Sequence, residues 1–311
     1  MERGKRRSLK LRVAGLKAAF AAVCAIAAAP AWAADGPVSE TPSSVWEVTR
    51  GRSTVFLGGT VHLLRAQDHP LPHAFQTAFE RSQRLFFEVD LKQFESPEGR
   101  RRVSELSRLP DGQRLPDRIS KPLYAQLQEF LKGRGMPGEQ LDRLTPSMAA
   151  MMVTSIEAAR LGARPDLGVE PVFDRKAREA GKPVLGLETP EFQLRLFEQL
   201  TAREQEELLR LTVENIQDTE KDLSDLIQAW RQGDANRLDE VLNRHFEGHE
   251  RLKKVILFDR NRAWIPAIEK ALQGDSETAF FLVGVGHLVG NQGVIQLLRE
   301  KGYEVSWVRG K

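Results

Sequence analysis

Two apolar segments near opposite ends of the chain each run into glycine and then histidine. Residues 54–57 precede Gly-Gly-Thr-Val-His, which ends at His62, and residues 279–283 precede Gly-Val-Gly-His, which ends at His287. The apolar residues predict two short buried strands. Glycine is expected to break each strand and to allow a tight turn. Because α/β proteins build sites where strands end, we expect the two Gly-x-x-His turns to meet.

The first 34 residues have the pattern of a secretory signal peptide. A basic leader is followed by an apolar run at 18–29 and by Ala-Trp-Ala, with cleavage expected near Ala33 and Ala34. The apolar run is short for a membrane span. The sequence therefore predicts an exported protein, periplasmic or secreted, with no transmembrane segment in the mature chain. Residues 35–44, which contain Pro, Ser and Gly, are expected to form a flexible tail.

Removal of this leader changes the sign of the net charge. The full chain has 46 Lys and Arg against 43 Asp and Glu, and the leader holds seven basic residues and one acidic residue. The remaining 39 and 42 give a mature charge of −3, so nucleic acid is not an expected partner. The single cysteine, Cys24, also lies in the leader, which excludes disulfides and thiolate chemistry in the mature chain.

Strand-like segments occur toward both ends of the chain, and most of the middle has a helical pattern. This predicts an α/β fold in which a mixed or mostly parallel sheet is flanked by helices, with a large helical insertion at about 96–250. Residues 45–311 are expected to form one domain. The long segment from 190 to about 231 is expected to be helical. The predicted strands are 45–49, 54–57, 85–90, 182–188, 279–283 and 303–308.

Four side chains are expected to converge at one edge of the sheet. His62 and His287 follow predicted strands, and Glu88 and Glu188 lie within or at the end of two others. Two imidazoles and two carboxylates suit a divalent transition metal with an open position, which can activate water at neutral pH. A carboxylate that does not bind the metal could act as a general base.

These residues belong to a set of motifs that resembles the TraB/GumN family. The set covers nearly all of the mature chain in the expected order: 59–63, 71–72, 85–90, 181–189 with Gln193, 260–261 with Trp264, and 284–290. The family is similar to the animal Tiki ectoenzymes, described as metal-dependent proteases, and more distantly to ChaN-like haem-binding proteins and erythromycin esterases. The resemblance implies an exported metal-dependent hydrolase acting on a peptide or protein.

The resemblance also implies roles for the four converging residues. His62, Glu88 and His287 would hold the metal, and Glu188 would be the general base or a fourth ligand. Ligands of the N and O type do not choose among zinc, manganese and cobalt. One departure from the family pattern is Glu170, which stands where an aspartate is common.

Arg260 and Asn261 match the family's polar pair before the last helix–strand unit. The resemblance implies that they bind substrate or stabilise an oxyanion. A structural salt bridge from Arg260 to Glu88 or Glu188 is the alternative. Three residues of the two turns are expected to contact substrate: Gly59, Thr60 and Gly286.

Two other functions are consistent with the same residues. The cleft could bind haem, a peptide signal or a polysaccharide fragment of the cell envelope without reaction. The site could also be degenerate, with the helical middle serving as the partner surface of an envelope scaffold. The sequence leaves the substrate, the metal and the oligomeric state open.

Overall fold

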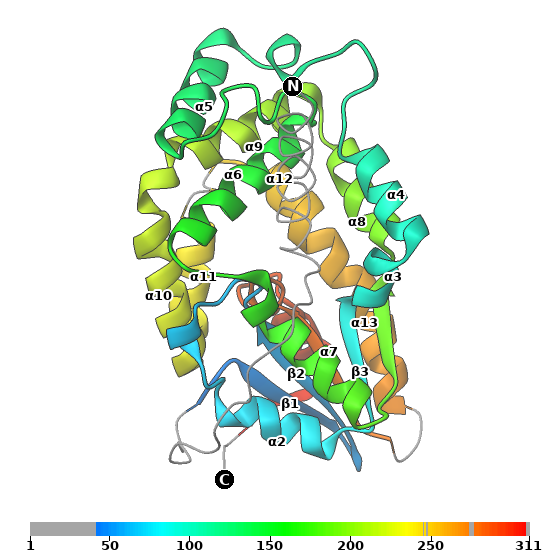
Figure 1. The fold of residues 1–311 in the computed structure, drawn as a ribbon. Coiled ribbons are helices and arrows are strands. Elements are labelled where there is room, and N and C mark those ends of the chain that lie inside the picture. The colour runs from blue at the N-terminus through cyan, green and yellow to red at the C-terminus, as the bar shows by residue number, and fades with distance from the viewer. Residues whose placement is uncertain (1–41, 245, 247, 274–276, 309–311) are drawn as a thin grey trace.

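A computed structural model describes residues 42–244, 246, 248–273 and 277–308. The predicted signal peptide (1–34) and most of the predicted tail (35–44) lie outside the described residues. A sheet forms the lower part of the molecule in Figure 1, and a set of helices stands above it. Among the residues that the structure describes, no helix has the length and apolar character needed to cross a membrane.

The sheet has six strands in the order β4-β3-β5-β2-β1-β6. The four strands β4, β3, β5 and β2 are parallel, and β1 is antiparallel to both β2 and β6. This confirms the predicted α/β fold with a mixed sheet. The strands are β1 (Val45–Arg50), β2 (Ser53–Thr60), β3 (Arg84–Val89), β4 (Val184–Glu188), β5 (Ala279–Gly284) and β6 (Glu304–Trp307).

The parallel strands end at a common edge. Thr60 at the end of β2 pairs with Gly284 at the end of β5, and Val89 of β3 pairs with Glu188 of β4. In parallel sheets this carboxyl edge is where ligands bind. The topology therefore brings the segments that follow four strands, far apart in the sequence, to one place.

The expected break of β2 at its glycines is wrong, because the strand continues through Gly58 and Gly59 to Thr60. Both glycines stay in register with β5. A Cβ at Gly58 would lie 2.7 Å from the Phe280 ring, and one at Gly59 would lie 2.7 Å from Val285. Glycine is needed here for close packing against neighbouring side chains and not for a turn.

Helices cover both faces of the sheet. In Figure 1, α2 (His73–Arg81) and α7 (Val169–Glu179) lie in front of the strands, and α13 (Asp259–Gln273) lies behind them. Consecutive side chains of β5 point to opposite faces of the sheet, so both faces are apolar and both are covered. Phe280 contacts the α7 residue Phe173, with ring centroids 6.0 Å apart, whereas Phe281 stacks on Phe86 of β3 at 4.5 Å. Helix α15 (Val294–Glu300) packs beside α13.

The helices above the carboxyl edge have a hydrophobic core of their own, which includes Leu127, Val153 and Leu209. The segment at 190–231 is helical as expected, but it is divided into several helices, because Thr201 and Glu204 form a capping box that starts a new helix. The helices that contribute to this core are α3 (Leu91–Glu95), α4 (Pro97–Leu106), α5 (Lys121–Gly133), α6 (Pro146–Arg160), α8 (Pro190–Arg195) and α9 (Ala202–Glu214). Helices α10 (Thr219–Gln232) and α11 (Ala235–Asn243) contribute to the core of the sheet instead, and α12 (Glu250–Lys253) contributes to a third, smaller cluster.

Candidate active site

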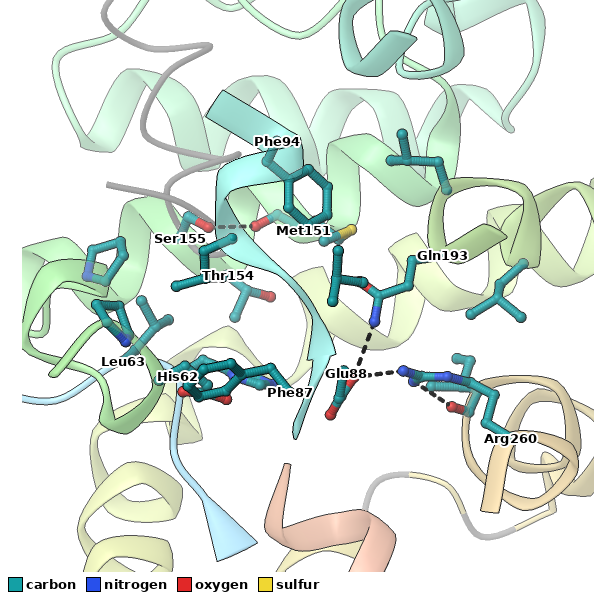
Figure 2. A pocket seen from close by; sticks show the side chains of 18 of the residues that line it. His62, Leu63, Phe87, Glu88, Phe94, Met151, Thr154, Ser155, Gln193 and Arg260 are labelled. Atoms are coloured by element: carbon teal, nitrogen blue, oxygen red, sulfur yellow. Dashed lines mark hydrogen bonds and ion pairs between the residues drawn. The ribbon is translucent and has the colours of Figure 1, made fainter. Parts of the chain in front are cut away.

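A cavity of about 350 Å³ lies between the carboxyl edge of the sheet and the helices above it. Most of its wall is apolar. Charged and polar side chains gather at the end nearest the strands, and Figure 2 labels four of them: His62, Glu88, Gln193 and Arg260. Glu170 also lines the cavity. Volumes of this size are typical of small-ligand sites, which are mostly apolar with a few polar groups that fix orientation.

His62 follows β2 and is held by the start of α7. Its Nδ1 lies 2.6 Å from Glu170 Oε1, which also accepts a hydrogen bond from the Thr60 hydroxyl. A Cβ at Gly168 would lie 2.3 Å from the His62 carbonyl oxygen, so only glycine lets α7 approach this closely. The negative charge of Glu170 raises the pKa of His62 to about 9. About half of the imidazole side chain, 52%, remains exposed.

His287 lies on the short helix α14 (Val285–Leu288) and is buried. Asn261 fixes its tautomer: the Asn261 amide donates to the Gln292 carbonyl at 2.8 Å, so its oxygen faces His287 Nδ1 at 2.7 Å. Nδ1 therefore carries the proton and donates it. The free lone pair on Nε2 lies 3.0 Å from Arg260 Nη1. Burial lowers the pKa of His287 to about 3, so the ring is neutral.

Glu88 links β3 to β5 and to α13. Its Oε1 accepts from the Gly284 amide at 2.8 Å, and its Oε2 accepts from Arg260 Nη2 at 2.5 Å and from Gln193 at 3.1 Å. Burial alone would raise the pKa of Glu88. The Arg260 guanidinium, together with the two histidines and the Gly284 amide, outweighs that effect and holds the pKa well below its usual range, so Glu88 is a carboxylate.

Arg260 and Glu188 form a two-point ion pair beneath the cavity. Arg260 Nε donates to Glu188 Oε1 at 2.9 Å, and Nη2 donates to Oε2 at 2.8 Å. Trp264 Nε1 and Gln193 Nε2 donate to the same carboxylate at 2.9 and 3.1 Å. Both partners are nearly buried, and Glu188 does not line the cavity. The predicted salt bridge is confirmed, and it reaches both Glu88 and Glu188.

The local structure of α13 explains how Arg260 reaches so many partners. Arg260 and Trp264 are four residues apart and share a face, with the guanidinium carbon 4.9 Å from the indole ring. A turn of π-helix, η6 (Lys254–Phe258), precedes α13. Arg260 Nη1 donates to the Ile256 carbonyl within that turn at 3.1 Å. Such π turns occur frequently at functional sites.

The two histidines and Glu88 meet around Gly284. A Cβ built on this glycine would lie 3.2 Å from Glu88 Oε1, 3.4 Å from His62 Nε2 and 3.6 Å from His287 Cδ2. Glycine at the end of β5 thus leaves a small space bordered by two imidazoles and a carboxylate. Glu88, Glu170 and Glu188 carry three negative charges, and Arg260 carries one positive charge. The formal charge of this group is therefore −2 when both imidazoles are neutral.

The donor chemistry of this space fits a divalent transition metal. His62 and His287 each have Nδ1 bonded to an oxygen, which directs Nε2 outward, as in most histidine metal ligands. A dication would also balance the surplus negative charge. As the side chains stand, the described part of the chain contains no group of three or more His, Cys, Asp or Glu residues placed to hold a metal. Arg260 occupies His287 Nε2, so coordination by that atom requires the guanidinium to give up this contact.

The structure brings together the six residues predicted as metal ligands or catalytic groups: His62, Glu88, Glu188, Arg260, Asn261 and His287. The three residues predicted to contact substrate do not line the cavity. Gly59 packs against Val285, Thr60 is buried on Glu170, and a Cβ at Gly286 would face Leu242. Their contact with substrate stays a prediction.

Glu170, Gln193 and Trp264 also belong to the site, although the sequence pattern indicates no chemical role for them. Glu170 is in the first turn of α7, directly after Gly168 and Val169, where an acidic residue complements the helix dipole. An acidic residue at a helix start is a common capping feature, so the sequence offered no reason to pair it with His62. Gln193 and Trp264 belong to motifs of the resemblance, and both prove to bind Glu188.

This fold and site define an α/β protein with a buried His–Glu–Arg cluster at the carboxyl edge of a mixed sheet. Residues 44–306 match the model of the TraB/PrgY/gumN family, and the chain belongs to that family. The match confirms the resemblance seen in the sequence motifs. No solved structure matches the chain.

Curated relatives include animal and bacterial proteins. Metalloprotease TIKI2 of Danio rerio is 26% identical over 326 residues, which is 87% of this chain and 62% of the relative. Metalloprotease TIKI1 of Homo sapiens is 25% identical, over 86% of this chain and 62% of the relative. The uncharacterized protein YbaP of Escherichia coli (strain K12) is 24% identical, over 80% and 89%. The chain thus spans about 62% of the length of these two TIKI proteins.

Proposed function

We propose that this protein is an exported, metal-dependent hydrolase that cleaves peptide bonds at the polar end of the cavity. The observation that carries the proposal is the meeting of His62 Nε2, His287 and Glu88 Oε1 around Gly284. The names of the TIKI relatives, which are metalloproteases, support the same reaction class. The leader-like pattern of residues 1–34 supports export.

His62, Glu88 and His287 are the residues that would hold the metal. A bound zinc, manganese or cobalt ion would supply Lewis-acid activation of the water and of the scissile carbonyl. Asn261 binds Nδ1 of His287, and Glu170 binds Nδ1 of His62. Each imidazole would therefore bind the metal through Nε2. His287 would exchange its contact with Arg260 for the metal.

Arg260 is the group that stabilises charge on the substrate. Peptide hydrolysis forms a bond from the water oxygen to the carbonyl carbon, breaks the C–N bond, and gives a carboxylate and an amine. Negative charge develops on the carbonyl oxygen during attack, and a fixed guanidinium at the cavity wall lowers the energy of that state. Glu188 accepts four hydrogen bonds on its two oxygens, two of them from Arg260, and so holds Arg260 in place. These contacts favour a positioning role for Glu188 over its predicted role as base.

Glu170 is the carboxylate that we assign to proton transfer. Of the two carboxylates on the cavity wall, Glu88 already accepts from Arg260, Gln193 and Gly284. Glu170 lines the cavity, and its buried Oε2 has no hydrogen-bond partner among the described residues. It can take the proton that the attacking water releases and pass it to the leaving amine.

The test is turnover of a peptide library by the purified protein, with and without zinc, manganese or cobalt. Glu170→Gln keeps an oxygen that can accept from His62 Nδ1 but removes the proton acceptor, so turnover should fall by about 10²- to 10⁴-fold while metal content stays unchanged. Glu170→Asp, which keeps the charge, should retain more activity than Glu170→Gln. Cleavage that is indifferent to metal, or a fully active Glu170→Gln variant, would contradict the proposal.

One observation favours a second function, in which the cavity binds a ligand without reaction. Arg260 is already paired with both Glu88 and Glu188. A guanidinium that stays in these ion pairs contributes to structure and not to catalysis. Tight binding of haem, a peptide or an oligosaccharide without hydrolysis, with any of the three metals, would support this function.

A further inference from the structure

Beyond its polar end, the cavity extends into an apolar lobe that the reaction itself does not need. The apolar lobe is formed by side chains from five elements: Leu91, Phe94, Met151, Leu194, Phe197 and Ile256. Figure 2 shows Phe94 and Met151 above Glu88 and His62. The lobe is therefore continuous with the groups that we propose to act on the peptide bond.

The hydroxyl groups in this part of the wall are already bonded within their own helix. Thr154 Oγ1 donates to the Ala150 carbonyl at 3.1 Å, and Ser155 Oγ donates to the Met151 carbonyl at 2.9 Å. Both hydroxyl groups therefore donate within α6 and do not donate into the lobe. A polar side chain entering the lobe would lose water without gaining these donors, whereas an apolar side chain would gain contacts.

We propose that the apolar lobe is the specificity subsite of the enzyme and receives one large apolar side chain, such as leucine, methionine or phenylalanine, next to the scissile bond. This inference rests on the proposed peptidase function. Met151 and Phe94 are the specificity-determining residues, because they line the lobe from two different helices, α6 and α3. The substrates are peptides with a large apolar residue beside the cleavage point.

The size of the cavity favours a side chain over a fatty acyl chain. At about 350 Å³ it lies near the lower end of the range for small-ligand sites, and part of that space belongs to the polar end. The space that remains suits one residue of a peptide.

The first experiment measures binding and does not depend on turnover. The protein contains five methionines, so labelling their methyl groups with ¹³C gives a simple NMR spectrum in which Met151→Leu identifies one signal. N-acetyl-leucinamide and N-acetyl-phenylalaninamide should shift the Met151 methyl signal in a saturable way. N-acetyl-glycinamide should not, and Met136, outside the cavity, is the internal control. Equal shifts with the glycine probe, no shift with any probe, or tighter binding of N-octanoyl-glycinamide would overturn the inference.

The second experiment measures cleavage preference with the peptide library and added metal. A large apolar residue at one position should raise kcat/KM by at least about tenfold over glycine, because apolar pockets discriminate by about 10- to 200-fold per methylene. Met151→Glu should lower this preference and raise cleavage after or before lysine and arginine. Met151→Leu, which keeps an apolar wall, should retain the original preference. Circular dichroism and thermal unfolding check that both variants fold.

The two experiments separate failure of the inference from failure of the proposed function. Cleavage without preference at any position overturns the subsite and leaves the peptidase intact. A shifted Met151 signal with no cleavage of any peptide rejects the peptidase and supports the lobe as a site for apolar residues.

Discussion

Asn261 accepts a hydrogen bond from His287 Nδ1 at 2.7 Å and so determines which nitrogen of that buried ring is free. The amide is itself oriented by its bond to the Gln292 carbonyl. Without this pair, the ring could carry its proton on Nε2, which would then repel both Arg260 and a metal. The predicted catalytic role of Asn261 becomes, in this account, control of a tautomer.

The first prediction concerns the tautomer of His287. Asn261→Leu removes the acceptor and should weaken metal binding by about 10- to 100-fold, as loss of a partner behind a histidine ligand usually does. Asn261→Asp keeps an acceptor for Nδ1 and should bind metal at least as well as the parent. Metal titration followed by calorimetry compares the three proteins. Equal affinities in the parent and Asn261→Leu would show that His287 is not a ligand.

The second prediction concerns the space at Gly284. Its backbone φ of −48° suits any residue, so Gly284→Ala should fold. The new methyl group would lie 3.2 Å from Glu88 Oε1 and 3.4 Å from His62 Nε2 and should exclude the metal. Gly286→Ala is the matched control, because its methyl group would meet Leu242 at an ordinary 3.5 Å and metal should still bind. Full metal occupancy in Gly284→Ala would place the metal elsewhere.

The third prediction concerns the buried ion pairs of Arg260. Arg260→Met leaves Glu88 and Glu188 without their cation, and the free energy of unfolding should fall by about 3–5 kcal/mol. Arg262→Met, on the same helix, removes an exposed guanidinium 3.4 Å from Asp259 and should cost less than about 1 kcal/mol. Urea unfolding of the metal-free proteins measures both. Similar losses in the two variants would mean that the buried cluster does not hold the fold together.

The fourth prediction concerns pH. The pKa of His62 is raised from 6.5 to about 9 by Glu170, so the ring is protonated in the metal-free protein at neutral pH. This raised value stabilises the folded state fully below pH 6.5, and the contribution is lost as pH rises through about 9. A metal needs the neutral ring, so its apparent affinity should rise about tenfold per pH unit from roughly 7 to 9.

His287 adds nothing to that dependence, because its lowered pKa of about 3 keeps the ring neutral throughout. About one proton should therefore be released per metal bound at pH 7. Calorimetry in two buffers of different ionisation enthalpy counts this proton. Metal binding that releases no proton is incompatible with His62 as a ligand. So is a metal affinity that stays the same from pH 6 to 9.

Much of the site could be predicted from the sequence because its residues follow strands. A run of apolar residues indicates a buried strand, and parallel strands bring their carboxyl ends together whatever their order. This was enough to place His62, Glu88, Glu188 and His287 in one region. The last helix of the site was also predictable, because Arg260 precedes an apolar pattern of helical period.

The remaining contacts depend on packing between distant segments. The approach of α7 to His62 requires glycine at 168, and no local pattern indicates that Glu170 then meets Nδ1. The glycines of β2 have the local pattern of a turn, whereas the side chains that require them, Phe280 and Val285, lie more than 200 residues away in the chain. In contrast, the helix start at Thr201 carries a local Thr-x-x-Glu signal, and the sequence alone could have located it.

The central claim is that His62 and His287 hold a metal, and metal content tests it most directly. The protein, purified without chelator and incubated with zinc, manganese or cobalt, is compared by elemental analysis with the His62→Ala/His287→Ala double variant. Thermal unfolding confirms that both are folded. We expect close to one metal ion per chain in the parent and none in the variant. Equal metal content in the two proteins, or no metal in the parent after incubation, would contradict the account.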